Sequence, residues 1–529
     1  MATPMWTRIV RQGCCRICRL QNVKRRTFCS KGGETIPFSS VPLTERLPGL
    51  PLPKYATVDN QKQVTQVTTL ENGLRVASEN KFGHFCTVGV LVDSGSRYEV
   101  AYPGGISHFL EKLAFNSTSQ YSRDEIYQIL EKHGGITDCL SARDTLIYAM
   151  SAESTALPLL SNILAEVTLR PQLTEQEIDD TRTTVTYELE SVEMNPDPES
   201  ILIEMSHAAA YQNNTLGLPK LCPKQSIPTL DRNTLLSYMY HHHTPDRMVV
   251  AGVGVDHQQF VEAVKESFLN KIPVWEDNPK VINPSAACDR SVAQYTGGQV
   301  KVNKDLSSVS LGPNPMPDLA HLVLGLESCS HKEDDFVSFC VLNILLGGGS
   351  SFSSGGPGKG MYTRLYTHVL NRYHWINSAS AVNHAYEDTG FFCIHSSCHP
   401  DRLGELAEVI AHEFCETAGN IRADELDRAK TQLQSMLMMN LEMRPVMFED
   451  VGRQVLANGH RRPVEYYFDA IGNITAADLH RVATRMLKTK LSVAAYGNLK
   501  KLPSYEEMQS YIGGKSSLYK QYNLFRMRR

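Results

Sequence analysis

The segment GISHFLEKLAF, residues 105–115, carries the strongest structural signal in the sequence. Its apolar residues recur every three or four positions, which predicts a helix over 104–115. In such a helix His108, Glu111 and Lys112 stand at positions i, i+3 and i+4, so their side chains lie on one face. The helix therefore brings an imidazole, a carboxylate and an amine to one place.

Strands and further helices are expected around this segment. Apolar and polar residues alternate in strands with one buried face, and the expected strands lie in 66–80, 85–96 and 146–153. Helical spacing of apolar residues predicts helices at 124–133, 156–169 and 175–192. Because these elements do not follow a regular β-α-β order, the expected fold class is α+β.

The same plan occurs twice along the chain. Two segments each contain a strand, a short turn, a helix and a long helix that begins E-[IL]-D-x-x-[RK]-T. This register aligns Glu177 with Glu425 and Arg182 with Lys430. Two homologous halves of about 220 residues explain the repeat most simply. The alternative is a chance similarity between two amphipathic helices.

A connector rich in Pro and Asn lies between the two copies of this plan. Such segments are typical domain boundaries, and each half then has the size of an ordinary domain. The expected organisation is a transit peptide at 1–33, an N-terminal extension at 34–64, a first domain at 65–271, a linker at 272–291 and a second domain at 292–529.

The amino terminus differs in composition from the rest of the chain. Residues 1–33 contain eight Arg or Lys, and no acidic residue precedes Glu34. Such segments are typical of mitochondrial transit peptides, and a disordered basic tail is the alternative. Its removal would leave 45 basic residues against 57 acidic ones, a net charge of about −12. That charge disfavours nucleic acid as a partner and attracts basic peptides.

Composition also argues against two other classes of protein. The longest apolar stretch is shorter than the run of about 18 apolar residues that a membrane span needs, so no transmembrane segment is expected. The 13 cysteines form no framework, which suits a compartment where thiols stay reduced. The C-x-x-C of Cys15 and Cys18 has no second pair, so a zinc knuckle is not expected.

The polar face of the 104–115 helix departs from a metal motif at one position. An inverted zinc-peptidase helix has the pattern H-x-x-E-H, and here Lys112 stands where the second histidine would be. A catalytic zinc needs three protein ligands and one open position. Glu188, 76 positions after Lys112, is the candidate for a third ligand from the long helix.

GISHFLEKLAFNST, followed at that distance by YELESVE, resembles the inverted zinc peptidases of the insulinase and pitrilysin family. This resemblance implies two similar α+β domains that face one another. It also implies that His108 matches the first zinc ligand, Glu111 the base that activates water, and Glu188 the distal ligand. Lys112 departs from the family pattern.

The lysine predicts a non-catalytic member of that family, with no catalytic residues and no metal of its own. An ammonium group has three donors and no lone pair, and its charge takes the place of the dication. We expect Lys112 to pair with Glu111 or Glu188 and to complete a structural network.

We expect no other segment to replace the incomplete zinc-peptidase site. The corresponding helix of the second half, FVSFCVLNILL, has no metal ligands, and HEFCE at 412–416 lacks the closing histidine of H-E-x-x-H. The run His241–His243 is consecutive, so its side chains diverge, and we expect a loop and a strand edge there.

A glycine-rich segment is the second unusual stretch. LLGGGSSFSSGGPGKGMYTRL contains seven glycines between Gly347 and Gly360. A nucleotide-binding loop requires G-x-x-x-x-G-K-[ST], and two positions fail because Ser353 and Gly360 stand in them. A flexible linker and a mobile loop that closes over a ligand both remain open.

The glycine-rich segment, with NRYHWI, YEDTG and RPVMFEDVGRQ, is similar to the non-catalytic subunits of heterodimeric processing peptidases in the same family. This resemblance implies a catalytic β subunit that carries the zinc, and no cofactor in this chain. It further implies binding of basic amphipathic presequence peptides in the mitochondrial matrix, with or without association with the inner membrane. The substrate-binding residues so predicted are Gly347, Gly348, Gly349, Ser350, Ser351, Phe352, Gly355, Gly356, Gly358, Lys359 and Gly360.

The composition of the chain suits this role. A glycine backbone can approach many different peptides closely, and negative charge attracts Arg-rich ones. We also weigh contacts between substrate arginines and Glu387 or Asp388 of YEDTG. Two alternatives are a structural core subunit of the respiratory cytochrome bc1 complex, which resembles the same fold, and a self-sufficient zinc peptidase. The glycine-rich segment argues against the first, and Lys112 against the second.

Overall fold

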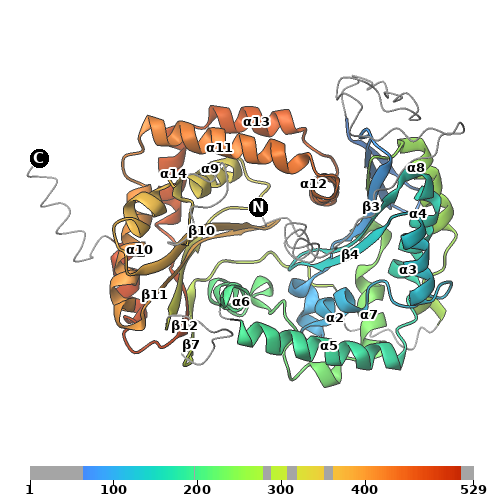
Figure 1. Cartoon of the computed structure of the whole chain (residues 1–529), viewed down its shortest axis with the longest axis horizontal. Coiled ribbons are helices and arrows are strands. Elements are labelled where there is room, and N and C mark those ends of the chain that lie inside the picture. The colour runs from blue at the N-terminus through green and yellow to red at the C-terminus, as the bar shows by residue number, and fades with distance from the viewer. Residues whose placement is uncertain (1–63, 196, 278–287, 307–317, 351–360, 514–529) are drawn as a thin grey trace, which may run out of the picture. The chain divides into compact units, whose positions relative to one another are not determined.

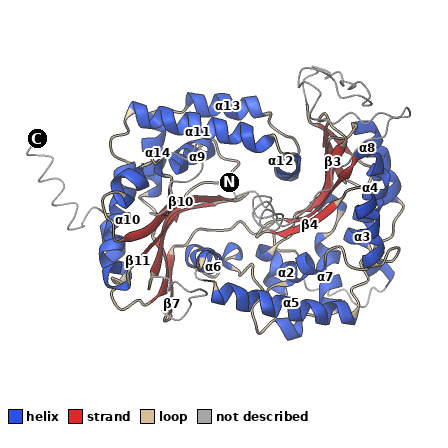
Figure 2. Ribbon diagram, viewed as in Figure 1, coloured by secondary structure: helices blue, strands red, loops and turns tan. Residues whose placement is uncertain are grey.

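The computed structural model describes residues 64–195, 197–277, 288–306, 318–350 and 361–513. Two six-stranded mixed sheets, one in each half of the sequence, organise this part of the chain, and helices pack on them (Figure 1, Figure 2). The fold class is α+β, as predicted. The predicted transit peptide and all but the last residue of the predicted N-terminal extension lie outside the described residues.

The first sheet has the strand order β1-β2-β6-β3-β5-β4. β2 and β6 are parallel, and every other neighbouring pair is antiparallel. Its strands are β1 (Gln66–Thr69), β2 (Arg75–Glu79), β3 (Phe85–Val92), β4 (Ile136–Ser141), β5 (Leu146–Glu153) and β6 (Met248–Val253).

The second sheet has the strand order β7-β12-β8-β11-β10-β9. β7 and β12 are parallel, and the remaining pairs are antiparallel. Its strands are β7 (Gly298–Asn303), β8 (Ala320–Glu327), β9 (Gly348–Ser350), β10 (Ile376–Ala385), β11 (Gly390–Cys398) and β12 (Ser492–Gly497). In the first sheet the pair β2–β6 is parallel, and the next three pairs in the strand order, β6–β3, β3–β5 and β5–β4, are antiparallel. In the second sheet the pair β7–β12 is parallel, and the next three pairs, β12–β8, β8–β11 and β11–β10, are antiparallel. This shared succession supports the predicted repeat.

Helices follow a matching order in the two halves. The first half contains α2 (Ile106–Leu113), α3 (Arg123–Lys132), α4 (Leu157–Leu169), α5 (Glu175–Met194), α6 (Glu199–Ala210), α7 (Arg232–His242) and α8 (His257–Val264). The second half contains α9 (Phe336–Leu346), α10 (Leu403–Thr417), α11 (Ala423–Leu441), α12 (Arg444–Asn458), α13 (Val464–Asn473), α14 (Ala476–Met486) and α15 (Tyr505–Ile512). The four predicted helices of the first half correspond to α2, α3, α4 and α5 to within two residues at each end, and the strand predicted at 146–153 is β5.

The predicted alignment of the two long helices is supported by how they begin. Glu177 and Glu425 are each the third residue of their helix, and each carboxylate accepts a hydrogen bond from the backbone N–H of the N-cap residue. This arrangement satisfies backbone donors that a helix start otherwise leaves unpaired. Arg182 and Lys430 each donate to a carbonyl oxygen of a later segment, so these aligned residues also have matching contacts.

Two helices pack on the sheet of the opposite half. α6 joins the second sheet in one apolar cluster, in which Met205 packs with Phe391. α12 joins the first sheet in another, in which Phe448 packs with Leu91. α6 follows the long helix α5, and α12 follows the long helix α11 (Figure 1). The exchange is therefore reciprocal, and each half supplies part of the other's apolar packing.

Small residues let α12 approach the first sheet closely. A side-chain carbon at Gly89 of β3 would lie 2.6 Å from Cζ of Phe448. A side-chain carbon at Gly452 of α12 would lie 2.2 Å from Cδ1 of Leu91. Close packing of this kind gains dispersion energy that a looser contact would lose.

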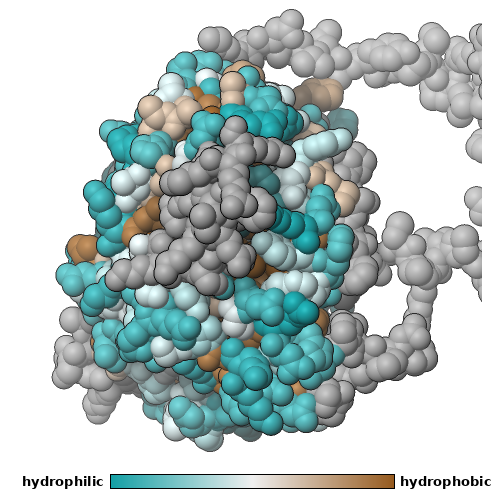
Figure 3. All heavy atoms as spheres, turned by 90° about the vertical axis from the view of Figure 1, so that its left-hand side faces the viewer, coloured by the Kyte–Doolittle hydropathy of each residue, from teal (hydrophilic) through white to brown (hydrophobic). Residues whose placement is uncertain are grey.

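The surface seen beside α10 is largely hydrophilic, with scattered apolar side chains between polar ones (Figure 3). Single exposed apolar residues are normal on soluble surfaces. Among the described residues, no helix combines the length and the hydropathy that a membrane crossing requires.

Candidate functional site

The helix that carries the degenerate metal motif, α2, is held at its N-terminus by a buried carboxylate. Glu99 accepts hydrogen bonds from the backbone N–H groups of Gly105 (2.6 Å) and Ser107 (2.8 Å). Burial outweighs these hydrogen bonds and raises the pKa of Glu99 to about 7. Gly105 has φ of 97°, and a side-chain carbon there would lie 2.4 Å from Cβ of Cys222, so only glycine fits.

His108 is buried between a backbone amide and the long helix α5. Its Nδ1 accepts a hydrogen bond from the N–H of Cys222 (3.2 Å), and its Nε2 lies 3.2 Å from Oε2 of Glu188. Because Nδ1 acts as the acceptor, the neutral ring carries its proton on Nε2 and donates it to the carboxylate. Both ring nitrogens are therefore engaged.

Lys112 lies between two carboxylates. Its Nζ lies 3.0 Å from Oε1 of Glu111 and 2.9 Å from Oε2 of Glu188. Burial opposes the charged ammonium, but the charge of Glu111 and the contacts with Glu188 raise the pKa of Lys112. The prediction that Lys112 pairs with Glu111 or Glu188 is confirmed, and it pairs with both.

These contacts hold the carboxylate of Glu188 ionised. Burial alone would raise the pKa of Glu188, but hydrogen bonds from His108 and Lys112 and the charge of Lys112 lower it to about 2. Glu111 accepts through Oε1 from Lys112 and through Oε2 from the N–H of Ser141 (2.8 Å). We call the four side chains His108, Glu111, Lys112 and Glu188 the α2 network.

The α2 network does not fit a catalytic zinc ion. It offers an imidazole and a distal carboxylate where three protein ligands are needed, and both groups already have partners. The ammonium group of Lys112 contributes a positive charge where a dication would bind. Both oxygens of Glu111 already accept a hydrogen bond, one from Lys112 and one from the N–H of Ser141. The network can stabilise α2 against α5 and β4, but it has no group poised for hydrolysis.

The histidine run at the end of α7 differs from its prediction. His241 and His242 end the helix and His243 caps it, so the expected loop and strand edge is wrong. Helical backbone continues because Tyr238 and His242 stack at 4.0 Å, and Nδ1 of His242 donates to the carbonyl oxygen of Tyr238 (2.8 Å). Burial lowers the pKa of His242 to about 3 and that of His243 to about 4. These rings are neutral core histidines.

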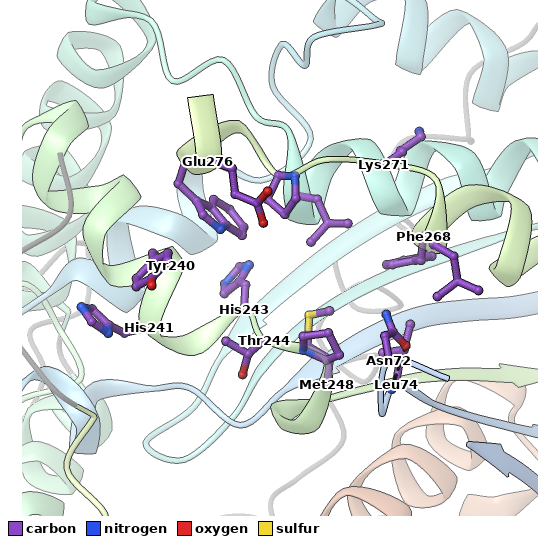
Figure 4. A pocket seen from close by; sticks show the side chains of 15 residues that line it. Asn72, Leu74, Tyr240, His241, His243, Thr244, Met248, Phe268, Lys271 and Glu276 are labelled. Carbon is purple, nitrogen blue, oxygen red and sulfur yellow. Dashed lines mark hydrogen bonds between the residues drawn. The ribbon is translucent and has the colours of Figure 1, made fainter. Parts of the chain in front are cut away.

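A pocket of about 420 Å³ lies beside the end of α7 (Figure 4). Its labelled side chains come from the turn between β1 and β2, from the segment that runs from the end of α7 to the start of β6, and from residues 268–276. His243 donates from Nδ1 to the carbonyl oxygen of Thr168 (3.0 Å), and Lys271 pairs with the buried Glu166 (2.8 Å). Both polar groups already have structural partners, and none of the four predicted substrate-binding residues that the structure describes, 347–350, lines this pocket.

The first part of the predicted substrate-binding segment is a strand. Gly348, Gly349 and Ser350 form β9, which pairs with β10 at the edge of the second sheet. A side-chain carbon at Gly348 would lie 2.1 Å from the carbonyl oxygen of Ala379, so β9 runs too close to β10 for any side chain there. Gly347 precedes the strand with φ of 55°. The remaining predicted residues, Ser351, Phe352, Gly355, Gly356, Gly358, Lys359 and Gly360, lie outside the described residues.

The acidic turn considered for substrate arginines is already engaged. Asp388 forms a two-point contact with Arg97, with one distance of 3.1 Å, and accepts from the N–H of Ala293 (2.7 Å). Burial is outweighed by these contacts, which lower the pKa of Asp388. Glu387 is half-exposed and pairs with Lys332. Asp388 therefore holds the two halves together, and the hypothesis that it contacts substrate is not supported.

Two family models match this chain. The model described as Insulinase (Peptidase family M16) matches residues 75–224, and the model described as Peptidase M16 inactive domain matches residues 229–433. The first match contains β2 to β5 of the first sheet, and the second match contains β6 of that sheet and β7 to β11 of the second sheet.

Curated relatives match over nearly the whole chain. "Mitochondrial-processing peptidase subunit alpha" of Bos taurus is 52% identical over 504 residues, covering 95% of this chain and 94% of that protein. The protein of the same name from Homo sapiens is 51% identical over 517 residues and covers 97% of both chains. The one from Caenorhabditis elegans is 43% identical over 459 residues, covering 86% of this chain and 89% of that protein.

A solved structure shares the fold at low sequence identity. A chain of "Complex III2 from Candida albicans, Inz-5 bound" superposes with a TM-score of 0.69 at 18% identity, covering 84% of this chain and 99% of that chain. The family matches, the relatives and the two-sheet architecture agree. The chain therefore belongs to peptidase family M16, the insulinase family, among the relatives named mitochondrial-processing peptidase subunit alpha.

Proposed function

We propose that this chain is the non-catalytic, substrate-recognition subunit of a heterodimeric mitochondrial processing peptidase. The observation that carries this proposal is Lys112, whose ammonium group lies between Glu111 and Glu188. Because the ammonium group of Lys112 takes the place of the metal ion, hydrolysis needs a second subunit that carries a complete site. We propose that a β subunit bearing an intact H-x-x-E-H supplies the zinc and the general base.

The proposed substrate is the basic amphipathic presequence of an imported precursor. A chain with about 12 more acidic than basic residues after loss of residues 1–33 attracts such peptides electrostatically. We propose that the segment from Gly347 to Gly360 contacts the peptide, with β9 as its anchored start. A segment rich in glycine offers backbone N–H and C=O groups to many sequences, which suits a protein that recognises varied presequences.

The proposed site of action is the mitochondrial matrix. The relatives are named as mitochondrial proteins, and residues 1–33 have the composition of a transit peptide. We further propose the domain boundaries at 65–271 and 292–529 with a linker at 272–291. The proposal rests on the connector's composition and on the repeated strand order of the two sheets.

The test is processing of a fluorescent presequence peptide by the purified chain, by a purified partner with an intact H-x-x-E-H, and by the two mixed. Only the mixture should cleave. Deletion of 351–360 leaves the β9–β10 pairing in place, and it should raise KM while the complex still forms. Gly459→Ala, at an exposed helix end with open space around it, is the matched control and should leave KM unchanged.

Two outcomes would contradict the proposal. Cleavage by the chain alone would mean that Lys112 does not block the site. A mixture whose KM is indifferent to the deletion would favour the alternative of a structural role, as in a core subunit of the cytochrome bc1 complex.

A further inference from the structure

A cluster of two imidazoles and one thiol lies on the second sheet, away from the α2 network. His384 stands near the end of β10, and Cys393 and His395 stand on β11. Their ligand atoms all lie within 4.8 Å of one another. No second group of three such side chains meets this spacing in the described part of the chain. We call these three side chains the β10–β11 cluster.

Strand register brings the cluster together. Cys393 pairs with Val382, two residues before His384, and His395 follows Cys393 by two residues. Alternate residues of a strand share one face, and diagonal neighbours on adjacent strands lie close. All three side chains therefore project from the same face of the sheet. That face also carries α6, since Cys393 belongs to the apolar cluster that α6 joins.

The cluster contains unpaired polar atoms. The Nε2 atoms of His384 and His395 are buried and have no hydrogen-bond partner. Buried polar atoms are nearly always paired, so each exception calls for an explanation. The neighbouring His207 differs, because its Nδ1 donates to the carbonyl oxygen of Ile203 (2.8 Å) and its Nε2 lies 2.7 Å from the hydroxyl of Tyr386. Unlike His207, the two cluster imidazoles therefore each have a ring nitrogen available for a ligand.

The protonation states suit metal binding. Burial lowers the pKa of His384 to about 3 and that of His395 to about 4, so both imidazoles are neutral near pH 7. Burial raises the pKa of the Cys393 thiol. A bound cation reverses that preference, because a coordinating thiol loses its proton.

We propose that His384, Cys393 and His395 bind one transition-metal ion that favours thiolate and imidazole ligands, Zn²⁺ or Cu⁺. Binding forms one bond from the Cys393 sulfur, whose proton passes to solvent, and one bond from the Nε2 lone pair of each imidazole. Ligand atoms around a tetrahedral zinc lie about 3.5 Å apart, so the side chains close in by about 1 Å. His384 and His395 are partly exposed residues, and in this proposal rotation of their rings brings the ligand atoms together. The ion ties β10 to β11 beside the contact with α6.

The experiment uses the full chain with Cys15→Ser and Cys18→Ser, a background that removes the separate C-x-x-C. After removal of metal with a chelator, the protein is titrated with Co²⁺ and then with Zn²⁺. We expect one Co²⁺ per chain, a thiolate-to-cobalt charge-transfer band, and loss of the band as Zn²⁺ displaces Co²⁺. A parallel Cu⁺ titration against a competing chelator decides which ion binds more tightly.

Single substitutions assign the ligands. Cys393→Ala should abolish the charge-transfer band. His384→Gln or His395→Gln should weaken metal binding by at least about 100-fold, more than the loss of a group that only orients a ligand usually costs. The matched control is Cys398→Ser, because Cys398 is a buried thiol of the same strand that packs in the core on the other face. This control should bind Co²⁺ like the background.

Thermal unfolding separates binding from misfolding. In chelator, each variant should unfold cooperatively, and added Zn²⁺ should raise Tm in the background and in Cys398→Ser but not in Cys393→Ala. The absence of both the charge-transfer band and a metal-dependent rise in Tm would overturn the proposal. So would a band or a Tm rise that survives Cys393→Ala.

Discussion

The two halves share one strand plan but carry different chemistry on it. In the first half, every member of the α2 network has a hydrogen-bonding partner within the chain. In the second half, the β10–β11 cluster keeps two buried nitrogens unpaired. Whether a group of side chains can bind a metal is therefore indicated better by its unpaired lone pairs than by its resemblance to a known metal motif. The side chains of the α2 network already have partners, whereas His384 and His395 on the strands each have an unpaired nitrogen.

The contact between the halves provides the largest expected effect. Arg461 follows α12 and pairs with Glu79 of β2, and these side chains are only 6% and 3% exposed. Arg461→Met leaves a buried carboxylate without its partner, so the free energy of unfolding should fall by about 3–5 kcal/mol. Urea denaturation at pH 7 measures this change.

The control for that substitution is an exposed ion pair on the same half. Arg428 pairs with Asp424 on the surface of α11 (2.9 Å). Arg428→Met should leave the urea midpoint unchanged, because surface pairs contribute little. If Arg461→Met were equally silent, the ion pair would not join the halves.

The edge strand β9 provides the next largest effect. Gly348→Ala forces a side chain against the carbonyl oxygen of Ala379 at φ of 100°, and the free energy of unfolding should fall by about 2–4 kcal/mol. Gly459→Ala is the control, since its φ is 75° but nothing lies within 4 Å, and it should cost about 1 kcal/mol. Equal losses would show that the close approach to β10 contributes nothing.

The α2 network provides a smaller effect. Lys112→Met leaves Glu111 and Glu188 without the cation between them, so the free energy of unfolding at pH 7 should fall by about 1–3 kcal/mol. The partial exposure of both carboxylates limits the loss. Lys112→Met combined with Glu188→Gln should recover part of it, because the repulsion is removed. No recovery in the double variant would mean that Lys112 acts through packing alone.

The smallest effect is on the pH dependence of stability, where Glu188 and Glu99 should act in opposite directions. The pKa of Glu188 is lowered to about 2, so its contribution is full above the unfolded value of about 4.3 and is lost as the pH falls toward 2. The pKa of Glu99 is raised to about 7, so its contribution is full below about 4.3 and is lost as the pH rises through 7.

Denaturation between pH 2 and pH 8 measures both contributions. Glu188→Gln should flatten the acid side of the profile, and Glu99→Gln should flatten the side between pH 4 and pH 7. Identical profiles for the two variants would contradict the assigned directions.

Local patterns in the sequence predicted much of the first half. Alternation and helical spacing are local signals, so they located β5 and the helices α2 to α5. The pairing of Lys112 followed from its position on the same helical face as Glu111 and from the family spacing to Glu188. The repeated helix start likewise aligned Glu177 with Glu425 correctly.

The missed features depend on contacts between distant residues. Gly348 and Gly349 have the composition of a linker, yet they form a strand because they pair with the edge of β10. The turn at Asp388 looked available for ligands, and only the fold brings Arg97 to it. His384 and Cys393 carry no recognisable motif, because a strand pairing places them together. No local pattern shows that α12 packs on the first sheet.

The exchange of α6 and α12 has a consequence for the origin of the chain. A single half standing alone would leave one sheet face uncovered and would carry a helix with no surface to cover. Two copies of such a half would satisfy each other by trading helices, as domain-swapped dimers do. The present chain then corresponds to a fused symmetric dimer. After fusion the side chains of the two halves could diverge. Neither half could be lost, because the helix that covers each sheet belongs to the other half.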